Sequence, residues 1–96
     1  MRRQHRFETE RENVLRRAVQ IRELIVRLSL SVQTFNWDIE AEEERARVHD
    51  PSDPAYPIVA RAWAKRRDNL NVTIAELRGR LNKVEANVAT NAETVL

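Results

Sequence analysis

The side chains with the most evident chemistry in this 96-residue chain are carboxylates gathered just before a proline-rich segment. They are Glu40, Glu42, Glu43 and Glu44. Such a run could bind a hard cation weakly, although clustered acids on one helix are ordinarily a solvated face. His5 and His49 have no neighbour suited to acid–base work, and a chain with no cysteine and one glycine lacks thiolates and Gly-rich phosphate loops. We expect no catalysis, no metal site and no cofactor.

Arginine is the other abundant functional type, since 15 arginines accompany only 2 lysines and the sequence pI is about 9.7. A long basic helix could lie against nucleic-acid phosphates. The candidate contacts would be Arg2, Arg3, Arg6, Arg16, Arg17 and Arg22. Interspersed glutamates dilute this positive field, so nucleic-acid binding is the least favoured of the functions considered.

The carboxylates above and most of the arginines lie in two stretches, residues 7–46 and 56–95, that carry a seven-residue apolar repeat. The fold that this repeat specifies determines where those side chains lie. The columns of the first stretch are Phe7, Val14, Ile21, Leu28, Phe35 and Ala18, Ile25, Val32, Ile39, Ala46. The columns of the second are Tyr56, Trp63, Leu70, Leu77, Val84 and Ile74, Leu81, Val88, Val95. This spacing is typical of a coiled coil. It predicts an all-α fold, an antiparallel two-helix coiled-coil hairpin, in a single domain spanning residues 1–96.

Prolines set the expected boundaries of the two helices. The residue before a proline is disfavoured as helical, so we expect a first helix over about 5–48, a turn over about 49–56 and a second helix over about 57–93. The second helix could instead begin at Pro54 with Asp53 as its N-cap. We favour Pro57, because the proline disfavours a helical Tyr56.

Charge alternates along the chain and supports an antiparallel fold. Residues 1–34 carry eight arginines against four glutamates, residues 35–53 two arginines against seven acids, and residues 54–84 seven bases against two acids. Folding back at the prolines brings acidic and basic runs together. We favour a register in which Glu42 faces Arg67. The alternative places Phe35 opposite Arg67 and Glu42 opposite Ala60, which leaves both charges against apolar partners.

A second apolar stripe lies on the face of the first helix that is turned away from the seam. Its members are Val19, Val26, Leu30 and Trp37. A two-helix hairpin cannot bury this face by itself, and an exposed stripe ending in tryptophan marks a partner surface. The partner could be a different protein or a second copy, which would form a homodimer with four helices. Ile58 and Val72 are the apolar residues on the outer face of the second helix.

No apolar run approaches the roughly 20 residues of a membrane span, and the first residues lack the apolar core of a signal peptide. We therefore expect a soluble, intracellular protein.

The segment around the prolines resembles FliJ-type flagellar export proteins of the alphaproteobacterial kind. The similarity lies in Ile39-Glu-Ala-Glu-Glu-Glu-Arg45, His49-Asp-Pro, Ala55-Tyr-Pro57, Ala60-Arg-Ala62 and Arg66-Arg-Asp-Asn-Leu70. Arg6-Phe7 and Val19-Gln-Ile21-Arg-Glu are also similar, so the resemblance covers most of the chain. Two departures are that the chain is shorter than most members and that Trp37 and Trp63 are not part of the family pattern.

The resemblance implies a non-enzymatic coiled-coil component of the flagellar type III export apparatus. Members of this family bind and stimulate the hexameric export ATPase, contact the export gate and handle export chaperones. The implied location is the cytoplasm, peripheral to the inner membrane at the export apparatus. The positions that match the family pattern, and where we expect family-specific contacts, are Tyr56, Pro57, Arg66, Arg67, Asp68 and Asn69. A generic coiled-coil adaptor or dimerisation module is the alternative function.

Overall fold

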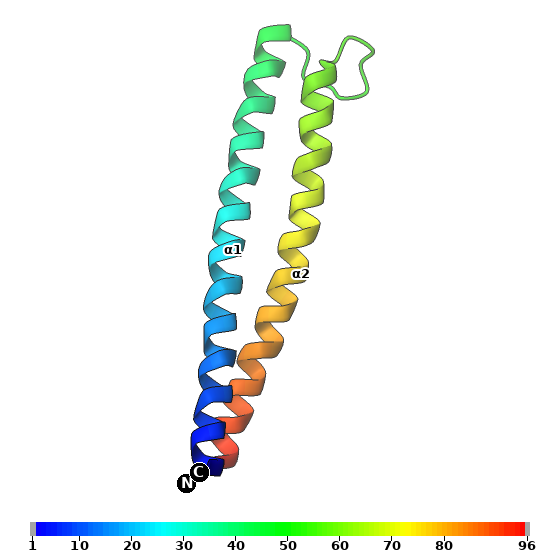
Figure 1. Cartoon of the computed structure of the whole chain (residues 1–96). Helices are drawn as coiled ribbons and strands as arrows, with labels where there is room; N and C mark the ends of the chain where they lie inside the picture. The colour runs from blue at the N-terminus through cyan, green and yellow to red at the C-terminus, as the bar shows by residue number, and fades with distance from the viewer. Residues whose placement is uncertain (1, 96) are drawn as a thin grey trace. The chain divides into compact units, whose positions relative to one another are not determined.

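The computed structural model describes the backbone of residues 2–95 and the side chains of residues 9–89. Over that backbone the chain forms α1 (Arg2–Ala46) and α2 (Ile58–Val95), joined by an irregular turn (Figure 1). The helices are packed against each other as a hairpin, so the predicted all-α antiparallel fold is confirmed. Some predicted side chains lie outside the described ones: His5, Phe7, Val95, Arg2, Arg3 and Arg6.

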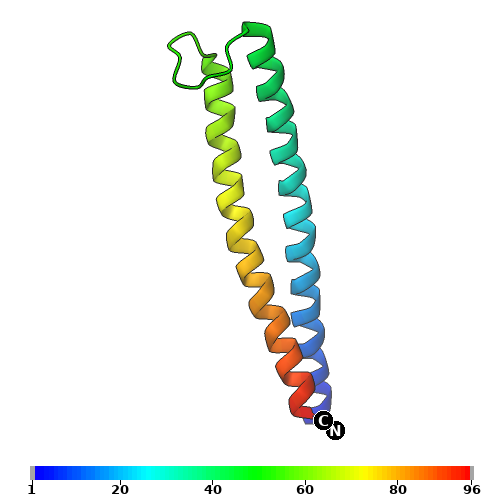
Figure 2. The ribbon, with the colours of Figure 1, turned by 180° about the vertical axis from the view of Figure 1, so that it is seen from behind.

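The chain divides into two compact units. The terminal unit comprises Met1–Val26 and Ala75–Leu96, and the turn unit comprises Arg27–Ile74. Within each unit, a segment of α1 lies beside a segment of α2, as both views show (Figures 1 and 2). The single domain over residues 1–96 stays a prediction.

The predicted seam is the buried face of both helices. Every seam residue whose side chain is described is buried or half-buried. In the turn unit the most buried are Ile39, Tyr56, Ala60 and Ile74, and in the terminal unit they are Ala18 and Leu77. In a pair of helices, each seam side chain is covered only by the facing helix and stays open to solvent at its sides. Most of the remaining seam residues are therefore only half-buried. Seam burial is nonetheless the main apolar contribution to holding each unit together.

α1 ends in a Schellman motif, which is why it stops at Ala46 and not at the predicted residue 48. The Val48 amide donates to the Glu43 carbonyl at 3.2 Å, and the Arg47 amide donates to the Glu44 carbonyl at 3.3 Å. Arg47 takes the left-handed conformation that this motif requires, with φ at 56°. Glycine is the usual residue there, so the sequence held no evident stop signal ahead of Pro51.

Two consecutive β-turns connect the helices, each beginning with Asp-Pro. The Asp53 amide donates to the Asp50 carbonyl, and the Tyr56 amide donates to the Asp53 carbonyl, both at 3.0 Å. Proline at the second position and aspartate at the first are the residues that such turns favour. Each aspartate also accepts a bond from the amide two residues on, from Ser52 at 2.9 Å and from Ala55 at 2.8 Å.

α2 begins at Ile58, one residue after the predicted start at Pro57. The Pro57 carbonyl accepts the first helical bond, from the Arg61 amide at 3.1 Å. A start at Pro54 capped by Asp53 does not occur, because the Asp53 carboxylate is used inside the second turn.

Candidate protein-binding surface

Tyr56 is the centre of the best-packed part of the turn unit. Its ring is buried with Ile39 and Ala60, and Trp63 packs against this cluster at half burial. The Tyr56 hydroxyl donates to Glu43 Oε2 at 3.1 Å. Burial, reinforced by the neighbouring Glu43 carboxylate, raises the pKa of the Tyr56 phenol. The side chain therefore links the segment just before α2 to the last turns of α1.

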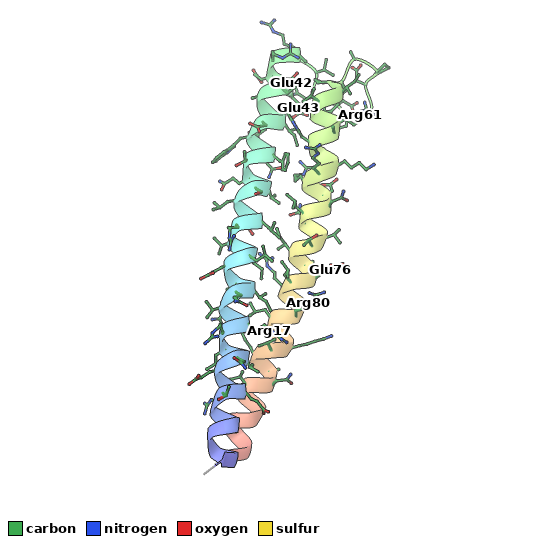
Figure 3. All side chains as sticks on the ribbon, in the orientation of Figure 1. Arg17, Glu42, Glu43, Arg61, Glu76 and Arg80 are labelled. Atoms are coloured by element: carbon green, nitrogen blue, oxygen red, sulfur yellow. The ribbon has the colours of Figure 1, made fainter. Side chains whose placement is uncertain are left out.

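Arg61 closes the same cluster from the outside. Its guanidinium carbon lies 5.7 Å from the centre of the Tyr56 ring, within cation–π range. Its Nη2 atom donates to the Pro51 carbonyl at 3.0 Å. Figure 3 shows Arg61 at the start of α2, with Glu42 and Glu43 near the end of α1. One arginine thus holds the first turn against the tyrosine.

The positions that match the family pattern differ in accessibility. Tyr56 is buried and Pro57 half-buried, whereas Arg66, Asp68 and Asn69 are exposed. Arg67 is half-buried, and its guanidinium donates to Asn36 Oδ1 and Asp68 Oδ1 at 3.1 and 3.2 Å. The partner-contact role of these six residues stays a prediction.

The predicted pairing of Glu42 with Arg67 is wrong. Glu42 instead accepts two bonds from Arg45, one turn later on the same helix, while Arg67 reaches Asn36. These contacts, with Ala60 packed against Ile39, agree with the alternative register, which places Arg67 opposite Phe35 and Glu42 opposite Ala60. The sequence disfavours that register only if both charged side chains are enclosed by apolar partners. Long charged side chains at a half-open seam reach local partners, so the penalty does not arise.

Three members of the acidic run, Glu42, Glu43 and Glu44, lie against local partners. Arg45 lowers the pKa of Glu42 by hydrogen bonding, Glu43 accepts from Tyr56, and Glu44 lies 3.9 Å from the His49 ring nitrogen Nε2. Among the side chains that are described, histidines and carboxylates form no group of three able to hold a metal ion. Of these acids, Glu43 ties the segment before α2 to α1, whereas Glu42 bonds within α1.

The second apolar stripe of α1 is exposed in both units. In the terminal unit, Val19 and Val26 are exposed at 48% and 58%. In the turn unit, Leu30 and Trp37 are exposed at 57% and 60%. We call the latter two the Leu30/Trp37 patch. Exposed apolar side chains that include a tryptophan make this patch the candidate protein-binding surface of the chain.

The hydroxyl groups next to the Leu30/Trp37 patch are hydrogen-bonded within α1. A shallow hollow beside Leu30 is lined by Leu30, Ser31, Thr34 and Phe35. The Ser31 and Thr34 hydroxyls donate to the carbonyls four residues earlier, at 3.3 and 3.1 Å. Neither hydroxyl therefore needs a ligand, and the hollow is a contour of the helix surface.

Exposed charges of both signs flank the patch. Arg27 lies one turn before Leu30, and Asp38 and Glu40 lie within one turn of Trp37. Within the described part of the chain, no ion pair engages any of these three charged groups. The patch thus has an apolar centre with separated positive and negative ends.

Sequence reasoning missed some exposed apolar residues. Leu15, four residues before Val19, extends the predicted stripe backwards, and the same spacing could have identified it. Leu24 on α1 and Val59 beside Ile58 are also exposed. Ile58 is the most exposed of them at 84%, and with Val72, also exposed, it occupies the outer face of α2 as predicted. Val59 gave no signal, because its position follows neither stripe.

Comparison of the chain with protein-family models, with curated proteins and with solved structures found no match. In the part of the chain that is described, neither helix combines the length and apolar character needed to cross a membrane.

Proposed function

We propose that this chain is a non-enzymatic, protein-binding helical hairpin. The observation that carries this proposal is the Leu30/Trp37 patch, an apolar surface with charged ends on a helix whose opposite face is occupied by α2. Tryptophan is enriched among the residues that dominate binding energy at protein interfaces.

We further propose that the chain works in flagellar type III export, in the cytoplasm at the inner membrane. There it binds and stimulates the hexameric export ATPase and contacts the export gate and export chaperones. The support is the resemblance to FliJ-type proteins at residues 39–70, together with a helical hairpin that presents Arg66, Asp68 and Asn69 to solvent. These exposed residues on α2 are the proposed ATPase contacts.

Co-purification with the cognate export ATPase, followed by a steady-state ATPase assay, tests the export role. The unaltered chain should be retained by the ATPase and raise its turnover at micromolar concentration. Arg66→Glu should weaken both effects, whereas Lys65→Glu, at the adjacent and also exposed position, serves as the matched control. No retention and no stimulation with the unaltered chain would overturn the export role.

A coiled-coil adaptor or dimerisation module is the second candidate function. It is favoured by the same Leu30/Trp37 patch, because two hairpins joined through α1 would form a four-helix assembly and cover it. Mass determination in solution separates this candidate from a hairpin that binds only a different protein.

A further inference from the structure

We infer that the Leu30/Trp37 patch binds a second copy of this chain, with the two α1 helices antiparallel about a two-fold axis near residues 32 and 33. This inference rests on the proposed role of the patch as a protein-binding surface. It adds the occupant, the orientation and the register, none of which the export role supplies.

The arrangement of charges around the patch carries the inference. A two-fold interface must be self-complementary, so a surface with one basic end and one acidic end fits its own copy only when reversed. Arg27 lies toward one end of the patch and Asp38 toward the other, and both are exposed. Reversal places Arg27 of each copy beside Asp38 of the other. By symmetry this gives two Arg27–Asp38 ion pairs across the interface.

The helical positions of these residues are consistent with that pairing. Two antiparallel helices bring corresponding flanks together, as in antiparallel coiled coils. At 100° per residue, Arg27 and Asp38 fall on the same flank of α1, about 20° apart in projection. A parallel pair would instead oppose different flanks, and Arg27 would not meet Asp38.

The other side-chain contacts across the interface follow from the same register. Leu30 of one copy lies beside Gln33 of the other, and Trp37 lies beside the stem of Arg27 and near Leu30. Gln33 sits next to the axis, where its amide can donate to and accept from the same residue of the second copy. A single polar residue within an apolar seam is a known means of fixing register and orientation.

The first experiment is a charge exchange, read by sedimentation equilibrium. The unaltered chain should show a reversible dimer. Arg27→Asp or Asp38→Arg alone sets like charges opposite each other twice, and each should weaken the dimer roughly tenfold. The double variant Arg27→Asp/Asp38→Arg restores both pairs, so its dissociation constant should return to within about twofold to threefold of the original. Lys65→Asp, on the outer side of α2, is the control.

The second experiment uses the absence of cysteine from the chain. A single cysteine introduced by Gln33→Cys lies next to the axis and should form a disulfide-linked dimer under mild oxidation. Ala41→Cys lies on the same face but two turns away, so it meets its own copy only if the helices are parallel. Linkage at position 33 without linkage at position 41 supports the antiparallel register.

A strict monomer, linkage at position 41, or failure of the double charge exchange to restore the dimer would each overturn the inference. These results are distinguishable from failure of the export role. A monomer that still stimulates the ATPase contradicts only the self-association, and a dimer that does not bind the ATPase contradicts only the export role.

Discussion

The two tryptophans of this chain differ in what the fold provides for them. Trp63 lies in the seam, half-buried against the cluster of Ile39, Tyr56 and Ala60. Trp37 lies on the opposite face of α1 and is 60% exposed. Both continue a seven-residue apolar spacing, so the sequence pattern does not distinguish them. The difference is whether another helix packs against the side chain. The seam has α2 against it, whereas none of the side chains described in the structure covers the Leu30/Trp37 patch.

Trp63→Ala should have the largest effect on stability. Truncation removes indole contacts with the buried cluster and leaves space that neighbours only partly fill, so we expect a loss of about 2–3 kcal/mol in the free energy of unfolding. Urea denaturation followed by circular dichroism measures it. An unchanged urea midpoint would mean that Trp63 contributes no more to stability than an exposed residue such as Trp37.

Tyr56→Phe sharpens the contrast within the covered region. The ring remains buried, but the bond to Glu43 Oε2 is lost, and we expect destabilisation of about 1 kcal/mol. Because the pKa of Tyr56 is raised, its phenol remains neutral at pH values above the usual range. The hydrogen bond therefore contributes fully to the free energy of unfolding below pH 10, and this contribution is lost as the pH rises through the raised pKa. In Tyr56→Phe that alkaline loss should be absent, which a denaturation series against pH would show.

Arg47→Gly should stabilise the hairpin by about 0.5–1 kcal/mol, because glycine adopts the left-handed conformation without steric cost. The same exchange at exposed Arg16, inside α1, should be destabilising by about 1 kcal/mol. Differential scanning calorimetry of the two variants gives opposite shifts if the C-terminal motif of α1 is as described. A lower melting temperature for Arg47→Gly would contradict it.

Trp37→Ala should have the smallest effect on stability, within about 0.5 kcal/mol in dilute solution, since exposed substitutions change little in the folded state. Its effect should appear instead in association, as a weaker dimer. Loss of helicity in dilute Trp37→Ala would show that this tryptophan stabilises the monomer, and the contrast with Trp63 would fail.

The helix content and the seam could be predicted from the sequence because a seven-residue apolar repeat allows few other solutions. Each described seam residue is buried or half-buried, and Leu30 and Trp37 are exposed, as their spacing predicted. The register could not be predicted. The sequence favours pairing Glu42 with Arg67 because both interrupt the apolar columns, whereas in the structure Arg45 donates to Glu42 and Arg67 donates to Asn36.

The exact end of α1, two residues before the expected position at about 48, could not be predicted from the sequence. Arg47 occupies a position where glycine would have been a recognisable signal, and only the bonds around it show that the helix stops there. The burial of Tyr56 could be anticipated from its column, but its bond to Glu43 depends on the path of the turn, which local spacing does not determine.

The two Asp-Pro turns also have a consequence for the order of folding. Tyr56 and Glu43 are 13 residues apart along the chain, whereas Arg22 and Glu85, which form an ion pair in the terminal unit, are 63 apart. Closing the shorter loop costs less chain entropy, and contacts of low sequence separation form early in small proteins. The hairpin should therefore close from its turn, so that changes near Tyr56 slow folding while changes near Glu85 mainly speed unfolding.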